Sequence, residues 1–200
     1  MDREIGVFSN TYMYNDKVEI DKKVDAGIYD IKEVMAGVSK AGFKYLGLIS
    51  TFGKIGHLFP KPFELDNNGA IGNLNLLSEY GLTLNCLYYY QGENSCFLDD
   101  KYLNIFKKVI VGAKLLNLSY ITTDSDAINT TEKEKMFYKN VISISEYASF
   151  FNITICIDIH GDWFCSGKKA AEIIKKVNCS NIRINYCTGN AIYLGKAILT

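Results

Sequence analysis

The strongest constraint on the fold is a regular alternation of short, β-branched apolar runs with longer segments of helical period. The runs are expected to form strands that begin near Glu4, Lys44, Leu82, Ser119, Ile153 and Ile182. Five segments with helical spacing of apolar residues lie between them. The fourth is expected to open in a capping box of Thr131 and Glu134, and the fifth at Ser166. This repetition predicts parallel strands joined by right-handed crossovers.

Two α/β architectures fit this alternation. A doubly wound sheet that binds a dinucleotide has a glycine fingerprint after its first strand, whereas this chain continues SNTYMYND, without glycine. The pattern therefore favours a TIM-type (β/α)8 barrel, in a single domain over residues 1–200. A complete barrel is typically ~250 residues long, so we expect about six of its eight βα units here, with strands 7 and 8 missing. Open sheet edges would then favour self-association into a homo-oligomer.

The composition limits the class of protein. The 22 basic and 22 acidic residues balance, and 48% of the residues are hydrophobic, which is typical of a globular chain and not of a disordered one. The lack of a basic surplus argues against nucleic-acid partners. No run reaches the ~18 apolar residues of a membrane span. The six cysteines form no CxxC pair and the start lacks a secretory signal, so we expect reduced thiols in a cytoplasmic protein.

Two late strands combine an apolar face with a polar face, although buried parallel strands are usually apolar throughout. In ITICIDIH the isoleucines alternate with a polar series that ends in Asp158 and His160. The run NIRINYC alternates in the same way and ends in Cys187. In a barrel the isoleucines would pack beneath the helices. Asp158, His160 and Cys187 would then meet at the C-terminal mouth, where barrel enzymes place their chemistry.

This polar face leaves two interpretations open. Asp158 can hold a hard divalent cation or act as a base, while His160 can bind a metal or polarise a substrate oxygen. Alternatively, loop amides satisfy the aspartate, and the histidine simply ends a strand. Because the chain contains only His57 and His160, a metal cluster of several histidines is excluded.

Other positions near strand ends also have both a functional and a packing interpretation. His57 follows the second strand and is expected to face the same mouth. In the Tyr88–Tyr90 run, alternation sends Tyr89 away from its neighbours, and packing in the core or at the rim is expected. Asp124 and Asp126 end the fourth strand on a shared face, either as supporting carboxylates or, more commonly at such a position, as turn residues. Trp163 either covers a sugar ring or packs against the barrel top.

Four stretches carry a resemblance to a known family: AGFKYLGL, LLSEYGLTL, ICIDIHGDW and NIRINYCTGNAIY. In this order they resemble the xylose isomerase-like family of sugar phosphate isomerases and epimerases, over essentially the whole chain. The resemblance implies a TIM barrel that binds a divalent metal through Glu, Asp, His and Glu from late strands. In such a site the metal polarises a carbonyl and a hydroxyl, and the glutamates move protons between adjacent carbons.

Position by position, Asp158 stands at the first glutamate of that site and Cys187 at its aspartate. The resemblance implies Asp158 as proton carrier and metal ligand, and Cys187 as a further metal ligand. A thiolate suits zinc better than magnesium or manganese, and Mn²⁺, Mg²⁺, Zn²⁺ and Co²⁺ are not distinguished. The expected substrate-binding residues are His57, His160, Asn185 and Asn190. The family's later histidine and final glutamate would lie beyond Thr200.

Two functional hypotheses follow. The first is an isomerase or epimerase that performs metal-assisted proton transfer on a small sugar, polyol or related hydroxy-carbonyl compound. The second is a non-catalytic, degenerate or truncated barrel that at most binds carbohydrate. The family also resembles endonuclease IV, whose three-zinc cluster needs more histidines than the two present here.

Overall fold

The computed structural model describes residues 6–8, 31–51, 65–90, 97–125, 127–161 and 163–193. Within these ranges one sheet contains the strands β1 (Gly6–Phe8), β2 (Tyr45–Thr51), β3 (Thr83–Tyr90), β4 (Tyr120–Thr123), β5 (Thr154–Asp158) and β6 (Ile182–Asn185). Neighbouring strands are parallel and lie in sequence order from β1 to β6. A doubly wound sheet changes direction at a switch point. The sequential order therefore confirms the barrel type of sheet.

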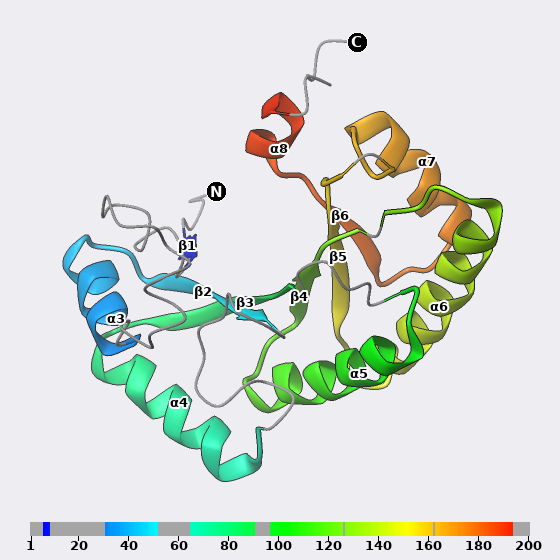
Figure 1. Cartoon of the computed structure of the whole chain (residues 1–200). Helices are drawn as coiled ribbons and strands as arrows, with labels where there is room; N and C mark the ends of the chain where they lie inside the picture. The colour runs from blue at the N-terminus through cyan, green and yellow to red at the C-terminus, as the bar shows by residue number, and fades with distance from the viewer. Residues whose placement is uncertain are drawn as a thin grey trace.

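Helices follow the convex side of the curved sheet (Figure 1). They are α3 (Ile31–Lys40), α4 (Asn67–Glu79), α5 (Asp100–Leu115), α6 (Thr131–Ser149) and α7 (Gly167–Val177), and the short α8 (Thr188–Tyr193) comes after β6. Each of α4 to α7 connects two adjacent parallel strands, as the alternation in the sequence predicts. Among the described residues, none of the helices combines the length and the apolar character needed to cross a membrane.

Side-chain caps mark where the helices begin. Ser166 accepts a hydrogen bond from the backbone N–H of Lys169 (3.2 Å), so the predicted start of α7 is confirmed. The predicted capping box at the start of α6 is wrong by one residue. Thr130, whose backbone is extended, caps this helix by accepting from the N–H of Lys133 (3.2 Å), and Thr131 is already helical.

A left-handed residue follows each of the five connecting helices. These residues are Gly42, Gly81, Asn117, Asn152 and Asn178, with φ between 54° and 84°. Glycine and asparagine tolerate this conformation better than other residues, and it reverses the chain at a helix C-terminus. The next strand then starts within a few residues. All strands consequently begin at one edge of the sheet, and all their carboxyl ends meet at the other.

The core lies between the sheet and the helices. The isoleucines of β5 and its flanks are at most 1% exposed on this side, which confirms the predicted apolar face. Tyr89 of β3 is fully buried there and stacks on Phe106 of α5, with ring centroids 5.3 Å apart. Phe97 and Phe137 extend this aromatic cluster by edge-to-face contacts. The packing interpretation of Tyr89 is therefore confirmed.

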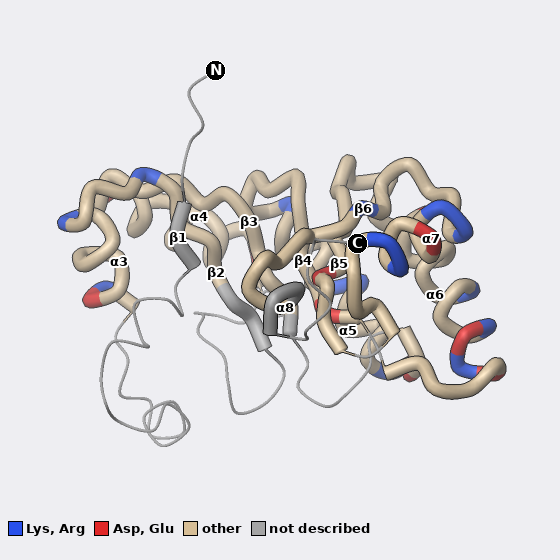
Figure 2. The backbone as a smooth tube through the Cα atoms, turned by 90° about the horizontal axis from the view of Figure 1, so that it is seen from above, with Lys and Arg blue, Asp and Glu red and all other residues tan. Residues whose placement is uncertain are grey.

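Most of the described lysine, arginine, aspartate and glutamate positions lie on the outer helices (Figure 2). The lysines of α7 are exposed, and Lys176 connects α7 to α6 through an ion pair with Glu134, with Nζ and Oε1 2.8 Å apart. The same Lys176 ammonium lies 4.3 Å from the ring centroid of Tyr138. Such exposed pairs contribute little to stability. The sheet's inner face is where the buried carboxylates lie.

Candidate functional site

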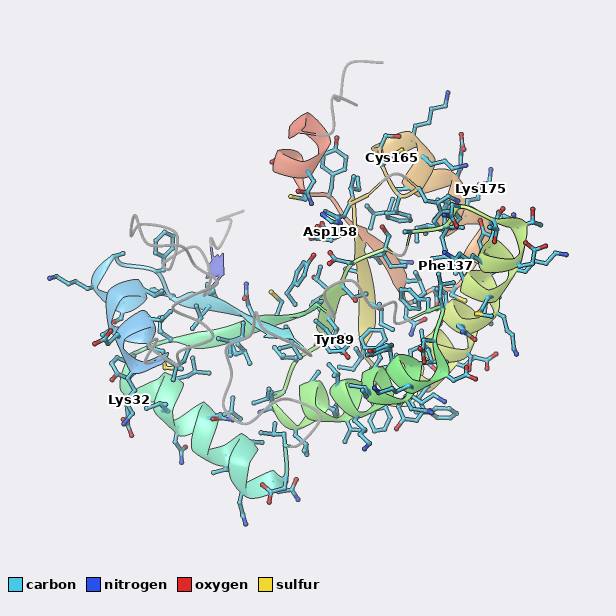
Figure 3. The ribbon with its side chains drawn as sticks, in the orientation of Figure 1. Lys32, Tyr89, Phe137, Asp158, Cys165 and Lys175 are labelled. Atoms are coloured by element: carbon cyan, nitrogen blue, oxygen red, sulfur yellow. The ribbon has the colours of Figure 1, made fainter. Side chains whose placement is uncertain are left out.

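Polar side chains from four consecutive strands converge at the carboxyl edge of the sheet. Tyr88 comes from β3, Asp124 directly follows β4, Asp158 ends β5 and Asn185 ends β6. The register pairs Asp158 with Asn185, and Thr123 with Ile157, so Asp124 is the next residue along β4 beside Asp158. Figure 3 shows Asp158 on the concave side of the sheet, facing away from the helices. This is the mouth where TIM-type enzymes place their catalytic groups.

Asp158 is the most enclosed polar group of this site, with only 4% of its surface exposed. The amide nitrogen of Asn185 donates to its Oδ1 (2.6 Å), and the amide nitrogen of Asn190 donates to its Oδ2 (3.0 Å). Both carboxylate oxygens therefore have partners. A buried carboxylate held in this way has a defined orientation, because rotation would break one of the two bonds.

The hydroxyl of Tyr88 connects two carboxylates. It donates a short hydrogen bond to Oδ1 of Asp124, and its oxygen lies 3.5 Å from Oδ2 of Asp158. The phenol ring projects from the level of Thr122 and Cys156, one inward position below the two carboxylates. A long aromatic side chain is needed to reach the upper level from there. Tyr88 therefore occupies the space between the two acids.

Burial dominates the acid–base properties of the site. It raises the pKa of Asp158 to about 6, while the hydrogen bond from Asn185 lowers it and the charge of Asp124 raises it further. Burial also raises the pKa of Asp124, against the lowering effects of the Tyr88 hydrogen bond and of His160. The pKa of Tyr88 is raised by burial and by the neighbouring carboxylates, so the phenol stays protonated. Asp158 consequently changes charge close to neutral pH.

His160 lies at the exposed entrance of the site, in the loop after β5. Its imidazole is close enough to lower the pKa of both Asp124 and Asp158. Its backbone carbonyl accepts a hydrogen bond from the hydroxyl of Ser125 (2.8 Å), which connects this loop to the end of β4. The loop is therefore anchored on the neighbouring strand.

Trp163 anchors the same loop on its other side. Its ring packs edge-to-face against Phe137 (4.8 Å between centroids) and Tyr138 (6.2 Å) of α6. The tryptophan thus packs against a helix, as one of the two sequence interpretations predicts. It contributes to the position of His160 through the loop that both residues share.

Cys187 precedes α8 and holds the start of this helix. Its sulfur accepts a hydrogen bond from the backbone N–H of Asn190 (3.4 Å), and Asn190 is also the residue whose amide donates to Asp158. The thiol lies close enough to Tyr88 to affect its pKa. Carboxylate, phenol, amides and thiol thus meet in one place. His57, the other expected substrate-binding residue, lies outside the described residues.

The donors around Asp158 can be compared with the requirements of a divalent metal. A metal ion needs oxygen, nitrogen or sulfur lone pairs directed at one point. Here both oxygens of Asp158 face N–H groups, and the described part of the chain contains no cluster of three histidine, cysteine, aspartate or glutamate side chains suited to a metal. As arranged, the described donors do not fit the metal that the resemblance implies. We therefore assign no chemical step to a metal.

Sequence reasoning singled out Asp158, Asn185, Asn190 and Cys187, and the structure brings these residues together. It did not assign Tyr88 to the site, and it left the role of Asp124 and Asp126 open; Asp126 lies outside the described residues. A usable signal was present, since YITTD and TICID are adjacent strands with matching isoleucines and matching final aspartates. Aligning the two strands by this pattern places both carboxylates at one level.

Solved structures of low sequence identity share this fold. A xylose isomerase-like TIM barrel protein from Mycobacterium smegmatis, solved in complex with magnesium, is 14% identical with a TM-score of 0.66, covering 84% of this chain and 58% of that chain. A probable 3-DHS dehydratase from Bacillus anthracis is 12% identical with a TM-score of 0.69, covering 96% and 66%. A D-psicose 3-epimerase from Clostridium cellulolyticum H10 is 14% identical with a TM-score of 0.68, covering 94% and 64%.

The chain spans less than two thirds of the length of each of these three proteins. No curated protein sequence matches it significantly. A model of the protein family described as "Xylose isomerase-like TIM barrel" matches residues 35–198. These residues include every described strand after β1 and the whole candidate site. The sequential parallel sheet, the polar carboxyl edge and this match agree, and the chain therefore belongs to the xylose isomerase-like TIM barrel family.

Proposed function

We propose that this chain transfers a proton between adjacent carbons of a small sugar, polyol or related hydroxy-carbonyl compound, as an isomerase or epimerase does. Asp158 is the proton carrier. The observation that carries the proposal is a buried carboxylate at the barrel mouth, held by two amides, whose pKa is raised to about 6. A general base or acid is most effective when its pKa lies near the working pH. The epimerases among the structural neighbours support the choice of substrate class.

We propose a role for each residue in this reaction. The carboxylate of Asp158 accepts the proton from the carbon beside the carbonyl, and the amides of Asn185 and Asn190 hold it in orientation. The proposed role of His160, which is exposed at the entrance, is to donate a hydrogen bond to a substrate hydroxyl. Proton transfer requires a fixed orientation of the Asp158 carboxylate, and the hydrogen bonds to its two oxygens supply it. His57 remains a proposed contact to the substrate.

Deuterium exchange tests the proposal directly. The 200-residue chain is incubated in D2O with a panel of ketoses and inososes, and proton NMR follows loss of the signal from the carbon beside the carbonyl. We expect exchange with at least one sugar and a loss of about 100-fold or more in Asp158→Asn. The matched control is Asp99→Asn, which changes an exposed helix-capping carboxylate. No exchange by the wild type with any of the sugars would remove the proposed function.

A second candidate is a carbohydrate-binding protein without catalysis. It is favoured by the same two amide bonds, because a carboxylate with both oxygens occupied can serve a structural purpose. Thermal stabilisation by a sugar without deuterium exchange would support this candidate. Exchange that depends on Asp158 would exclude it.

We also propose that the 200-residue chain associates with copies of itself. In the described part of the sheet, β1 and β6 are each paired with one strand only. Unpaired strand edges present free backbone donors and acceptors to other chains. Light scattering is expected to give a mass of at least two chains, and a sharp monomer peak with a cooperative melt would contradict this.

A further inference from the structure

We propose that Tyr186 is a positioning residue of the candidate site, which places Asn190 against Asp158 by packing on Gly167 at the start of α7. Tyr186 acts through Asn190 and needs no contact with the substrate. Its part in turnover rests on the proposed function. Its effect on Asn190 is a property of the chain that can be measured without a substrate.

The first argument is the direction of the Tyr186 side chain. Along β6 and its continuation, successive side chains alternate between the two faces of the sheet. Ile182 is fully buried and Ile184 is partly buried against the core, both on the helix side. Asn185 belongs to the opposite, concave series, with its amide in the candidate site. Tyr186 continues the helix-side series and is 42% exposed, so more than half of its surface is covered.

The second argument is the close approach of the Tyr186 ring to Gly167, the first residue of α7. A Cβ atom placed on Gly167 would lie 3.0 Å from Cε2 and 3.8 Å from Cδ2 of this ring. The backbone at Gly167 has no positive φ that would call for glycine, and alanine is normally the better helix former. The missing side chain at Gly167 therefore matters because it leaves room for the ring of Tyr186.

The third argument is that the two amides that hold Asp158 are anchored differently. Asn185 is the last residue of β6, and its backbone carbonyl accepts a hydrogen bond from the N–H of Ile159 (3.1 Å), so the sheet fixes its position. Asn190 lies beyond the strand, in the short α8, where strand pairing no longer holds the chain. The packing of Tyr186 ties this segment to α7. Asn190 therefore depends on Tyr186, whereas Asn185 does not.

The position of Asn190 matters because each amide serves one oxygen of Asp158. Asn190 donates to Oδ2 (3.0 Å), and Asn185 donates to Oδ1 (2.6 Å). A shift of Asn190 removes its bond to Oδ2 and lets the carboxylate turn about the bond that remains. In the proposed reaction, a carboxylate with a less fixed orientation transfers protons more slowly.

Proton–nitrogen NMR of the side-chain amides tests the positioning role without a substrate. The Asn185 and Asn190 signals are assigned by their loss in Asn185→Ala and Asn190→Ala. In Tyr186→Ala, proton exchange of the Asn190 amide with water should be faster by about 10-fold or more, because a charge-assisted hydrogen bond is lost. The Asn185 amide should keep its wild-type rate. Tyr186→Phe, which keeps the ring, should behave as the wild type.

A substitution on the other side of the contact gives a second variant. Gly167→Ala should push the Tyr186 ring away and accelerate exchange of the Asn190 amide, by a smaller factor than Tyr186→Ala. Gly72→Ala in α4 is the control, because a Cβ atom there would meet nothing within 4 Å. An unchanged Asn190 rate in Tyr186→Ala would overturn the positioning role. Equal acceleration of the Asn185 and Asn190 amides would also overturn it, since the whole site would then depend on the contact.

Deuterium exchange into a sugar separates the role of Tyr186 from the proposed function. If the wild type exchanges, Tyr186→Ala should exchange at least about 3-fold more slowly, and Tyr186→Phe at the wild-type rate. A wild-type rate in Tyr186→Ala would overturn its part in turnover and leave the proposed function standing. If the wild type shows no exchange with any sugar, the proposed function fails, and the amide measurement alone decides the role of Tyr186. The backbone amide spectrum of each variant verifies that it is folded.

Discussion

The two faces of β5 differ in the environment of their side chains, which is apolar on one face and polar on the other. On the helix side, Ile155 and Ile157 are completely buried against α6 and its neighbours. On the concave side, Cys156 is half-buried and Asp158 is enclosed by hydrogen-bond donors. The first face stabilises the fold through buried apolar area. The second face costs stability when Asp158 is charged, because burial disfavours the carboxylate.

In this one short strand, the side chains that stabilise the fold and those with acid–base properties lie on opposite faces. A single period of two residues alternates the side chains between an apolar environment and a polar one. Loss of an apolar contact on one side should reduce stability and leave the acid–base properties unchanged. Loss of a hydrogen-bond donor on the concave side should instead change the pKa of Asp158 and have little effect on stability.

The largest effect is expected for Ile157→Ala on the helix side. Removing three buried carbons leaves a cavity that neighbouring side chains fill only in part, and should cost about 2–5 kcal/mol of stability. The matched change on the concave side, Cys156→Ala, should cost less than about 1 kcal/mol. Urea denaturation of both variants measures the difference. Equal losses would contradict the distinction between the faces.

The pH dependence of stability should reveal the free-energy cost of burying the charged Asp158 carboxylate. Its pKa is raised to about 6 in the folded chain, against about 3.9 in an unfolded one. Because the folded pKa is the higher one, this stabilising contribution is fully present below about pH 4 and is lost as the pH rises through about 6. Relative to Asp158→Asn, the wild type should lose about 2 kcal/mol between about pH 4 and pH 7. If the free energies of unfolding of the two proteins changed with pH in parallel, the charge of Asp158 would not destabilise the folded chain.

The amide of Asn185 should lower the pKa of Asp158, an effect smaller than that of burial and opposite in sign. It donates to Asp158 Oδ1 and favours the charged form. In Asn185→Ala the pKa of Asp158 should therefore rise by roughly one further unit, measured by carbon-13 NMR. Asn68→Ala, an exposed change on α4, is the control and should leave the titration unchanged. A fall in the pKa after Asn185→Ala would contradict the assigned donor.

The smallest effect is expected from divalent metals. Since the two oxygens of Asp158 face amide N–H groups, calorimetric titration of the 200-residue chain with Mg²⁺ or Mn²⁺ should detect no binding tighter than about 1 mM. Asp158→Ala should give the same result. Tight binding that this substitution abolishes would show that the amides turn away to admit a metal, and would return Asp158 to the role of ligand.

Much of the fold can be read from the sequence because its signals are local. Five helices are followed by a left-handed glycine or asparagine, and the next strands are rich in β-branched, leucine or tyrosine residues. Such patterns depend on near neighbours in the chain and are visible without coordinates. The inward position of Asp158 follows in the same way from its alternation with the isoleucines.

The site was less predictable, because its contacts join residues that are distant in sequence. Tyr88 and Asp158 are 70 positions apart in the chain and are separated in the sheet by strand β4. Only the length of the tyrosine side chain brings its hydroxyl to the level of the carboxylates. Whether an asparagine amide presents N–H or C=O to an acid depends on the partner opposite. The bond between Cys187 and Asn190 likewise appears only once α8 is folded.

The sequence by itself determined the alternating architecture, the apolar and polar faces of β5 and the position of Asp158 at a strand end, since each follows from backbone periodicity. Only the tertiary structure decided that Asp124 and Tyr88 join this acid, and that its oxygens face amides. Those features arise from distances between side chains on different strands, which are set by register and packing.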